Sequence, residues 1–275
     1  MKFLENIEAL MAKNKTLLCV GLDPDPRQIP KDFLQKAKPF FEFNKVIIEA
    51  TKNLVCAYKP QVAYYSAAGA EDELAETIRY IRKLNIPVIL DSKRGDIGDT
   101  AAMYAKEAFE RYAADAVTVN PYMGGDTLAP YLKYAEKGVI VLCKTSNVGS
   151  GDLQDLPVLS APSDTTGSQL LYEIVAKKAA QEWNQNQNVM LVVGATHVGA
   201  LQKIRGIVGE MTLLVPGVGA QGGDLKAVLH AGLNSKRKGL IINSSRGILY
   251  AGSENVAESA QAAALKVVTE MREFL

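Results

Sequence analysis

The chain is poor in the residues from which disulfide frameworks and metal sites are built. Its 275 residues include three cysteines, Cys19, Cys56 and Cys143, and two histidines, His197 and His230. The cysteines are odd in number and far apart, and each stands in an apolar run that favours a strand. We therefore expect small buried thiols in a reducing compartment rather than disulfides. No cysteine spacing typical of a bound metal occurs, so no metal site is expected.

Strong net charge and long hydrophobic runs are also missing. The formal net charge is +1, which gives no indication of a nucleic-acid or membrane partner held by bulk electrostatics. No run of about 18 apolar residues occurs, so no membrane span is expected. The N-terminal segment follows a helical pattern, carries Glu5 and Glu8 and has no cleavage site, which argues against a signal peptide. These absences, with the cysteine usage, predict a cytoplasmic protein.

What the sequence does contain is a repeated alternation of strand and helix. With 48% hydrophobic residues, the chain has ample material for a buried core. Most of the strand-like runs are continuously apolar, as expected for parallel strands that are covered on both faces. Eight such runs are predicted as strands: Leu17–Leu22, Cys56–Val62, Val88–Lys93, Ala116–Pro121, Val139–Thr145, Val189–Ala195, Leu213–Val218 and Leu240–Ser245.

The helical patterns between these runs decide the fold class. They are found at Phe40–Lys52, Glu71–Leu84, Thr100–Ala113, Gln169–Asn184, Ala200–Val208, Gly223–Leu229 and Val256–Phe274. Alternating strands and helices predict a parallel sheet, and eight units in a chain of this length predict a TIM (β/α)₈ barrel. We expect a single α/β domain over residues 1–275. A doubly wound open sheet is the main rival, but the first strand ends in Gly21-Leu22-Asp23-Pro24-Asp25 rather than G-x-G-x-x-G.

One long segment stands outside this alternation. Ser146–Ser168 is rich in Gly, Ser, Asp and Pro and follows the fifth predicted strand. A long loop in a compact domain is usually functional or disordered. Because it follows a barrel strand, it is expected on the catalytic face, either as a lid or as a plain insertion.

The polar residues at the strand ends fall into two groups. In a barrel these ends form the active site. Charged residues of alternating sign follow the first three strands. Glycines and hydroxyls follow the last two, over Gly217–Gly223 and Asn243–Arg246. Glycines allow backbone N–H groups to approach an anion and arginine adds a charged fork, so the second group favours a phosphate site. The alternative is that these glycines only form a tight turn.

Within the first group, Asp91 and Lys93 are two residues apart on one strand. Alternating side chains on a strand would place both on the same face, which is expected to be the barrel interior. Two buried charges are costly unless they are paired. Paired, each keeps the other ionised. A purely structural ion pair is the alternative, although the nearby Lys59 and Asp96 would then have no purpose.

The segment Leu90-Asp91-Ser92-Lys93-Arg94-Gly95-Asp96-Ile97 resembles the Asp-x-Lys-x-x-Asp signature of orotidine 5′-phosphate decarboxylases, and the wider pattern is similar to the longer bacterial branch, type 2, of that family. The resemblance runs from about Leu17 to Arg246, in order. The supporting segments are Val20-Gly21-Leu22-Asp23-Pro24, Tyr58-Lys59-Pro60-Gln61, Asn120-Pro121-Tyr122, Cys143-Lys144-Thr145-Ser146-Asn147, Val193-Gly194-Ala195-Thr196 and Pro216-Gly217-Val218-Gly219-Ala220-Gln221-Gly222-Gly223-Asp224.

The resemblance implies a TIM-barrel homodimer that converts orotidine 5′-phosphate to UMP and carbon dioxide without metal or organic cofactor. It implies that Lys93 protonates the pyrimidine carbon and that Asp91 sits beside the substrate carboxylate. Asp23 and Lys59 would hold the ribose and complete an alternating charge network, so that Lys59 and Asp96 join Asp91 and Lys93 as catalytic residues. The remaining implied roles are pyrimidine contact by Ser146, phosphate binding by Gln221, Ser245 and Arg246, and contacts in the neighbouring subunit's site by Asp96, Ile97 and Thr100.

Two short segments depart from the family pattern. Val148 stands where the branch has proline, and Val198-Gly199-Ala200 stands where it has Pro-Glu-Glu. Both lie in loops, so they put only loop details in doubt. His197 and His230 match no functional motif, although the place of His197 at a strand end leaves a role at the edge of the site open.

Three alternative functions remain at the level of the sequence. One is another barrel enzyme of the same suprafamily, acting on a sugar phosphate as a decarboxylase or aldolase. Another is an aldolase that forms a Schiff base through Lys144 or Lys59. The third is a catalytically silent protein that binds a phosphate ligand. The intact Asp91, Lys93 and Asp96 argue against the third.

Overall fold

A barrel of eight parallel strands forms the centre of the molecule. The computed structural model describes residues 2–159, 168–219 and 222–275. The barrel strands are β1 (Leu18–Leu22), β2 (Ala57–Pro60), β3 (Ile89–Arg94), β4 (Ala116–Val119), β5 (Gly138–Lys144), β8 (Val189–Val193), β9 (Leu213–Pro216) and β10 (Leu240–Ser244). Their side chains are almost all buried, which explains why the corresponding runs of sequence are apolar rather than alternating.

The strand order shows that the sheet curls back on itself. The order is β2-β1-β10-β9-β8-β5-β4-β3, and every neighbouring pair is parallel. The two ends of this order meet through isolated parallel bridges between Tyr58 and Val88 and between Gln61 and Asp91. The predicted TIM barrel is confirmed.

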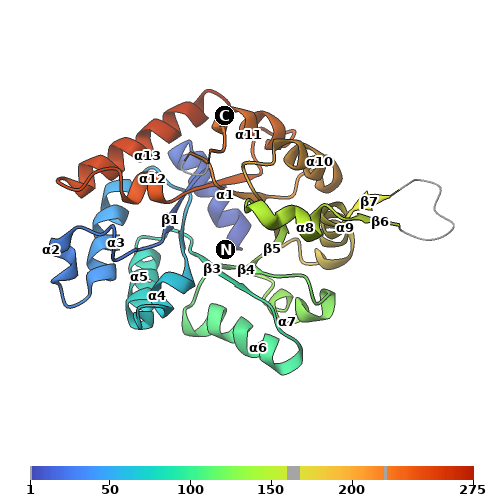
Figure 1. Cartoon of the computed structure of the whole chain (residues 1–275), viewed down its shortest axis with the longest axis horizontal. Coiled ribbons are helices and arrows are strands. Elements are labelled where there is room, and N and C mark those ends of the chain that lie inside the picture. The colour runs from blue at the N-terminus through green and yellow to red at the C-terminus, as the bar shows by residue number, and fades with distance from the viewer. Residues whose placement is uncertain (1, 160–167, 220–221) are drawn as a thin grey trace.

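Helices surround the strands, as Figure 1 shows. The longer ones are α3 (Pro39–Thr51), α5 (Glu71–Lys83), α6 (Gly98–Lys106), α9 (Leu171–Lys178), α10 (Val198–Val208), α11 (Leu225–Gly232) and α13 (Val256–Arg272). Two of them continue as π-helical turns, α6 into Glu107–Arg111 and α9 into Ala179–Trp183. Contacts join α3 to α5, α9 to α10, α10 to α11 and α11 to α13, and α13 packs on α3, so the last helix meets one of the first.

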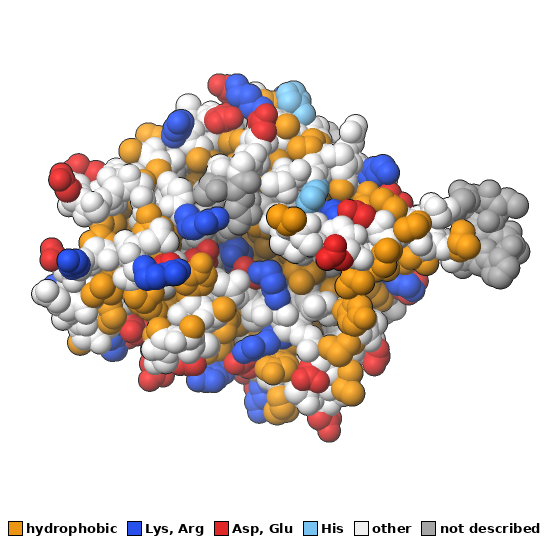
Figure 2. Space-filling view, in the orientation of Figure 1, with side chains coloured by type: hydrophobic (Ala, Val, Ile, Leu, Met, Phe, Trp, Pro, Cys, Tyr) orange, Lys and Arg blue, Asp and Glu red, His pale blue; other side chains and the backbone are white. Residues whose placement is uncertain are grey.

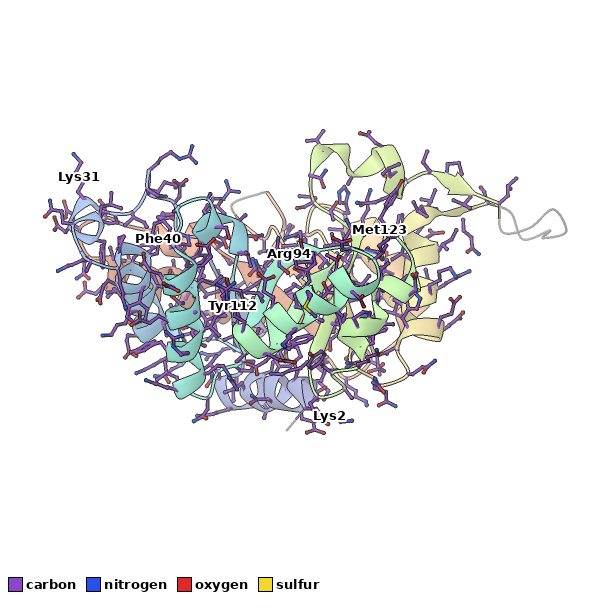
Figure 3. All side chains as sticks on the ribbon, turned by 90° about the horizontal axis from the view of Figure 1, so that it is seen from below. Lys2, Lys31, Phe40, Arg94, Tyr112 and Met123 are labelled. Atoms are coloured by element: carbon purple, nitrogen blue, oxygen red, sulfur yellow. The ribbon has the colours of Figure 1, made fainter. Side chains whose placement is uncertain are left out.

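One end of the barrel is covered by α1 (Phe3–Asn14), the helix expected from the N-terminal pattern. The ring of Phe3 lies over the start of β5, where a side-chain carbon added at Gly138 would come within 2.6 Å of it. In Figure 3, α1 lies at the bottom and α8 (Gly151–Gln154) at the opposite end. The closed end is therefore the N-terminal end of the strands, and the open end carries their C-terminal ends.

The segment Ser146–Ser168, expected to be irregular, contains regular structure where it is described. It forms a 3₁₀ turn at Val148–Ser150, then α8, then the strand β6 (Pro157–Val158), which pairs antiparallel with β7 (Gln169–Leu170). The predicted helix over Gln169–Asn184 is therefore wrong in its first two residues. Residues 160–167 lie outside the described part of the chain.

Several short elements were not expected, and each lies in a connection that follows a strand. They are α2 (Lys31–Leu34), α4 (Val62–Ser66), α7 (Ala129–Leu132), α12 (Arg246–Leu249) and a 3₁₀ turn at Gly125–Thr127. Such short helices carry too few residues for a periodic pattern.

The three cysteines are free and fully or almost fully buried, as predicted. Burial raises the pKa of the Cys19 thiol to about 12, so this thiol is protonated at neutral pH. No helix within the described ranges is both long and apolar enough to span a bilayer.

Candidate active site

A chain of three charged side chains lies at the open end of the barrel. Lys59, from β2, donates to Asp91 Oδ2 over 2.7 Å, and Lys93, from β3, donates to Asp91 Oδ1 over 2.6 Å. Lys59 and Asp91 are 4% and 5% exposed, whereas the Lys93 side chain is 41% exposed. Lys93 is therefore the member of the trio that a ligand can reach. Figure 2 shows charged side chains of both signs gathered in a hollow at the centre of this face.

Lys93 reaches Asp91 through an irregularity in β3 and not through regular alternation. The pairing of β3 with β4 shifts register between Leu90 and Arg94. Lys93 lies within this bulge, and its φ of +50° places it in the left-handed region. The predicted contact between the two side chains is confirmed, but the predicted reason for it, regular alternation along the strand, is wrong.

Thr118, on β4, was not among the expected site residues, yet it organises the centre of the site. Its hydroxyl donates to Asp91 Oδ1 over 2.8 Å. The hydroxyl oxygen of Thr118 also accepts hydrogen bonds from the backbone N–H groups of Ser92 and Lys93, each over 3.0 Å. One buried hydroxyl therefore holds both the carboxylate and the bulge. A threonine inside an apolar strand is the sequence signal that could have indicated it.

The two lysines determine the charge of Asp91. Burial by itself raises the pKa of Asp91, but the charges and hydrogen bonds of Lys59 and Lys93 outweigh it and hold that pKa below its ordinary value. Burial likewise disfavours the charged form of Lys59, while Asp91 and the more distant Asp23 raise its pKa above the ordinary value. At neutral pH, Asp91 is an anion and Lys59 a cation.

Asp23 and Ser245 meet at the neighbouring strand ends of β1 and β10. Ser245 Oγ donates to Asp23 Oδ2 over 2.6 Å, and the Tyr250 hydroxyl donates to the backbone oxygen of Asp23 over 2.9 Å. Gly21 permits this approach, because a side-chain carbon there would lie 2.8 Å from that of Ser245. Within the described residues, the buried acceptors Asp23 Oδ1 and Asn243 Oδ1 have no hydrogen-bond partner. Buried acceptors of this kind suit a ligand that brings hydroxyl donors.

The glycine-rich segment after β9 follows the strand that pairs with β10, and it is described over residues 217–219 and 222–223. Gly217 and Gly219 have φ values of +97° and +77°, which favour glycine. An isolated parallel bridge joins Val218 to Gly223. Gln221 lies outside the described residues, so its predicted phosphate contact is not placed.

Arg246 follows β10 and opens α12. It is exposed, and within the described ranges its guanidinium has neither a carboxylate partner nor a hydrogen-bond acceptor. An unpaired arginine close to the Asp23–Ser245 pair is compatible with the predicted phosphate site. Ser245, in contrast, already donates its hydroxyl to Asp23.

Asp96, Ile97 and Thr100 lie beyond the end of β3 and are not brought into the Lys59–Asp91–Lys93 trio. The Asp96 carboxylate accepts from the N–H of Ile97 over 2.8 Å and, within the described chain, pairs with no lysine or arginine. Ile97 is 62% exposed, and Thr100 is exposed on the first turn of α6. Ile97 and Thr100 face solvent, and Asp96 is half-buried.

Ser146 lies at the rim of the barrel, beside the end of β8. Its backbone and Cβ are so close to Gly194 that a side-chain carbon added there would come within 2.8 Å of them. Lys144, which precedes it by two residues, is buried and bound to Asp155. Across the described part of the chain, no group of three or more His, Cys, Asp or Glu side chains is placed to share a metal ion.

Comparison with known proteins identifies the family. The model of the orotidine 5′-phosphate decarboxylase / HUMPS family matches residues 16–263. The chain belongs to this family. Every charged or polar residue placed at the barrel mouth above lies within that match.

Relatives in this orotidine 5′-phosphate decarboxylase / HUMPS family cover the whole chain. A protein of Dechloromonas aromatica named orotidine 5′-phosphate decarboxylase is 52% identical over 100% of this chain and 98% of its own. One of the same name from Cellvibrio japonicus is 53% identical over 97% of each chain. Among solved structures, Leishmania donovani OMP decarboxylase superposes with a TM-score of 0.86 and 42% identity, over 100% of this chain and 99% of the other.

The two departures from the family pattern lie at the rim. Val148 opens the 3₁₀ turn after β5 with its side chain fully in solvent, and Val198–Ala200 forms the first turn of α10. Neither segment makes a hydrogen bond or an ion pair with Lys59, Asp91 or Lys93.

Proposed function

We propose that the chain decarboxylates orotidine 5′-phosphate to UMP and carbon dioxide, the last step of de novo pyrimidine nucleotide synthesis. The observation that carries this proposal is the position of Lys93. Its ammonium group is accessible to a ligand at the barrel mouth, while Asp91, buried and anionic, is fixed against it by Lys59 and Thr118. Relatives about half identical in sequence bear the name of this activity.

The trio suits a decarboxylation that uses no electron-accepting group. When the bond from the ring carbon to the carboxylate breaks, its electron pair stays on that carbon as carbon dioxide leaves. The Lys93 ammonium stabilises this developing negative charge and then gives the carbon a proton, and the lysine is reprotonated from solvent. Asp91 sits beside the departing carboxylate and keeps Lys93 charged and oriented. Preorganised charges of this kind act strongly because they need not rearrange during the reaction.

The remaining site residues hold the rest of the nucleotide. Asp23 Oδ1, which has no partner within the described chain, accepts from a ribose hydroxyl, and Lys59 lies beside it on the next strand. Arg246 and Gln221 bind the phosphate, Ser245 contributes through its backbone N–H because its hydroxyl donates to Asp23, and Ser146 contacts the pyrimidine. Because the phosphate is remote from the reacting carbon, its binding energy serves to hold the base in place.

The protein acts as a homodimer in which Asp96, Ile97 and Thr100 complete the partner's site. This is supported by their position beyond the end of β3, by the exposure of Ile97 and Thr100, and by large apolar side chains exposed around them. Ile97, just before α6, and Met103, on α6, are at least 60% exposed, and Tyr122, after β4, is 78% exposed. Figure 2 shows hydrophobic side chains on this side of the face, over α6 and α7. An apolar surface beside a functional site is typical of an interface.

Two further assignments complete the proposal. The whole chain, residues 1–275, acts as a single barrel domain, which is supported by the packing of the last helix, α13, on α3 and β1. The protein works in the cytoplasm, which is supported by three free, buried cysteines.

The structure gives a reason to prefer this function over the Schiff-base aldolase. Such an enzyme needs a lysine whose amine is neutral. Lys59 and Lys144 are each ion-paired, and the pKa of Lys59 is raised rather than lowered. The other two alternatives, a sugar-phosphate enzyme of the same suprafamily and a silent phosphate binder, are distinguished from this function by the activity test below.

The test is the loss of absorbance when purified protein meets orotidine 5′-phosphate in buffer treated with a chelator. We expect turnover that the chelator does not reduce. Absence of turnover by folded protein would refute the proposal, and turnover abolished by the chelator would point to a metal-dependent relative. Borohydride added with substrate should trap no covalent adduct on Lys59 or Lys144.

A further inference from the structure

Lys144, the last residue of β5, is a buried cation that takes no part in the Lys59–Asp91–Lys93 trio. Its side chain is 2% exposed. Its ammonium group donates to Asp155 Oδ2 over 2.8 Å and to Ser150 Oγ over 3.1 Å. A buried charge persists only where partners replace its lost hydration. Both partners belong to the segment that follows β5, so the charge of Lys144 ties that segment to the barrel.

Two more polar contacts fasten the same segment, residues 145–155, which we call the β5 loop. The N–H of Thr145 donates to Gln154 Oε1 over 2.9 Å, and Gln154 Nε2 donates to Thr145 Oγ1 over 2.8 Å. Ser150 Oγ lies 3.4 Å from Nε2 of His197, at the start of α10. The end of the loop, Gln154 and Asp155, is thus bound to Thr145 and Lys144 at its start, and Ser150 in its middle lies next to His197, which follows β8.

Apolar packing of the β5 loop is sparse among the described residues. Its largest apolar side chains, Val148 and Leu153, are exposed, and Ser150 is its one buried member. Burial of apolar surface therefore contributes little to its conformation. We infer that the polar contacts of Lys144, Gln154 and Ser150 chiefly determine where the loop lies. Figures 1 and 3 show the result: α8 stands over the open end of the barrel.

Ser146 lies between the fastened ends of this loop. It is packed against Gly194 on one side and is two residues from Lys144 on the other. We propose that Lys144 is a positioning residue for recognition of the substrate's base: through Asp155 and Ser150 it holds the β5 loop so that Ser146 faces the pyrimidine ring. This inference rests on the proposed function, and in particular on the contact of Ser146 with the base.

The experiment compares ligands with and without the base. UMP and ribose 5-phosphate share the sugar phosphate, and only UMP carries the pyrimidine. In Lys144→Met we expect the affinity for UMP to fall about tenfold, equivalent to about 1.4 kcal/mol, while the affinity for ribose 5-phosphate changes less than about twofold. KM for orotidine 5′-phosphate should rise by a similar factor, with kcat changed less than about threefold.

A matched control lies at the opposite end of the same strand. Lys137 precedes β5, donates to the backbone oxygen of Ala114 over 2.7 Å and pairs with Asp115 over 3.5 Å. Lys137→Met removes a comparable tether far from the open end, so the ratio of the two affinities should stay at the wild-type value. A ratio that falls equally in both lysine variants would overturn the proposal.

Asp155 provides a variant that is safe for folding, because its side chain is 44% exposed. Asp155→Asn should shift the affinity ratio in the same direction as Lys144→Met, and Asp155→Glu should restore most of it. A wild-type ratio in Asp155→Asn refutes the inference even if Lys144→Met does not fold, and so does an equal loss of both ligands. Wild-type turnover is measured first: its absence refutes the proposed function, whereas turnover with an unchanged ratio refutes this inference alone.

Discussion

Thr118 on β4 and Asp91 on β3 are joined by a hydrogen bond of 2.8 Å from the threonine hydroxyl to the carboxylate. The same hydroxyl accepts from the N–H groups of Ser92 and Lys93. It therefore connects the buried anion of the site with the bulge that turns Lys93 toward it. The site is positioned by a strand neighbour that carries no charge.

Replacement of Thr118 by valine tests this connection. Valine keeps the shape but removes the hydroxyl, which leaves the N–H groups of Ser92 and Lys93 without their acceptor. We expect a loss of about 1–3 kcal/mol in the free energy of unfolding. We also expect kcat to fall about tenfold or more, because Asp91 and Lys93 are no longer held together. Urea unfolding and the absorbance assay measure the two effects.

Two control variants separate these effects. Thr118→Ser retains the hydroxyl and should keep most of the activity. Thr51→Val removes another buried hydroxyl, which lies between α3 and β2, donates to the backbone oxygen of Ile47 and is 2.7 Å from the Tyr58 hydroxyl; it bonds to no member of the trio, so this change should lower stability without lowering kcat. Equal kcat values for Thr118→Val and wild type would show that Thr118 has no part in positioning the trio.

Lys93 allows its chemical role to be separated from its backbone conformation. Lys93→Ala should reduce decarboxylation by roughly a thousandfold, because the proton donor is gone, while UMP binding stays measurable. Lys93→Gly should be equally inactive but more stable than Lys93→Ala by about 1 kcal/mol, since glycine adopts a φ of +50° without strain.

Calorimetry with UMP, the absorbance assay and urea unfolding check these three expectations. Activity near wild type in Lys93→Ala is incompatible with the proposed mechanism. Equal stability of the alanine and glycine variants would mean that the bulge relaxes when the lysine is lost.

The depressed pKa of Asp91 makes stability depend on acidity in a definite direction. Because the folded value lies below the ordinary value of about 3.9, Asp91 stabilises the fold above that pH, and this contribution is lost as pH falls through the folded pKa. The raised pKa of Lys59 has the opposite sense: its contribution is complete below about pH 10.4 and is lost only as pH rises through the higher folded value.

Lys59→Met should therefore move the acid limb of the stability curve to higher pH, by about one unit, because Asp91 loses a principal partner. The free energy of unfolding in urea between about pH 3 and 7 measures this shift. Lys38→Met is the control: it breaks an exposed ion pair with Glu76 and should leave the acid limb in place. An unmoved acid limb in Lys59→Met would contradict the electrostatic role assigned to Lys59.

The barrel could be predicted from the sequence because buried parallel strands are continuously apolar. The strand-end residues Asp23, Lys59 and Ser245 followed from that prediction, since every strand ends at the same side. The contact between Asp23 and Ser245, 222 residues apart, was not specified by any local pattern. It follows from the pairing of β1 with β10, which only closure of the barrel provides.

Other features depend on tertiary pairing that a period cannot reveal. The bulge in β3 arises where Arg94 pairs with Val119, so strict alternation assigned the right contact to Lys93 for the wrong reason. The partner of Lys144 is Asp155, in a segment that sequence composition indicated as irregular. The helix α8 in this segment has four residues, too few for a periodic apolar pattern to appear in the sequence, and it is held by polar contacts rather than by an apolar face.

The position of Asp96, beyond the end of β3 and outside the Lys59–Asp91–Lys93 trio, leads to a test of shared sites. If Asp96 serves the partner, Lys93→Ala and Asp96→Ala subunits are each inactive as homodimers, but a mixed dimer holds one site with both residues intact. Equal amounts that exchange at random form mixed dimers in about half of cases, so about one quarter of wild-type activity should return. Activity is measured before and after the variants are mixed under dissociating conditions, and the mixed dimer is confirmed by native mass spectrometry. A confirmed mixed dimer without activity would place Asp96 in its own subunit's site, where its present separation from Lys93 would have to close within one chain.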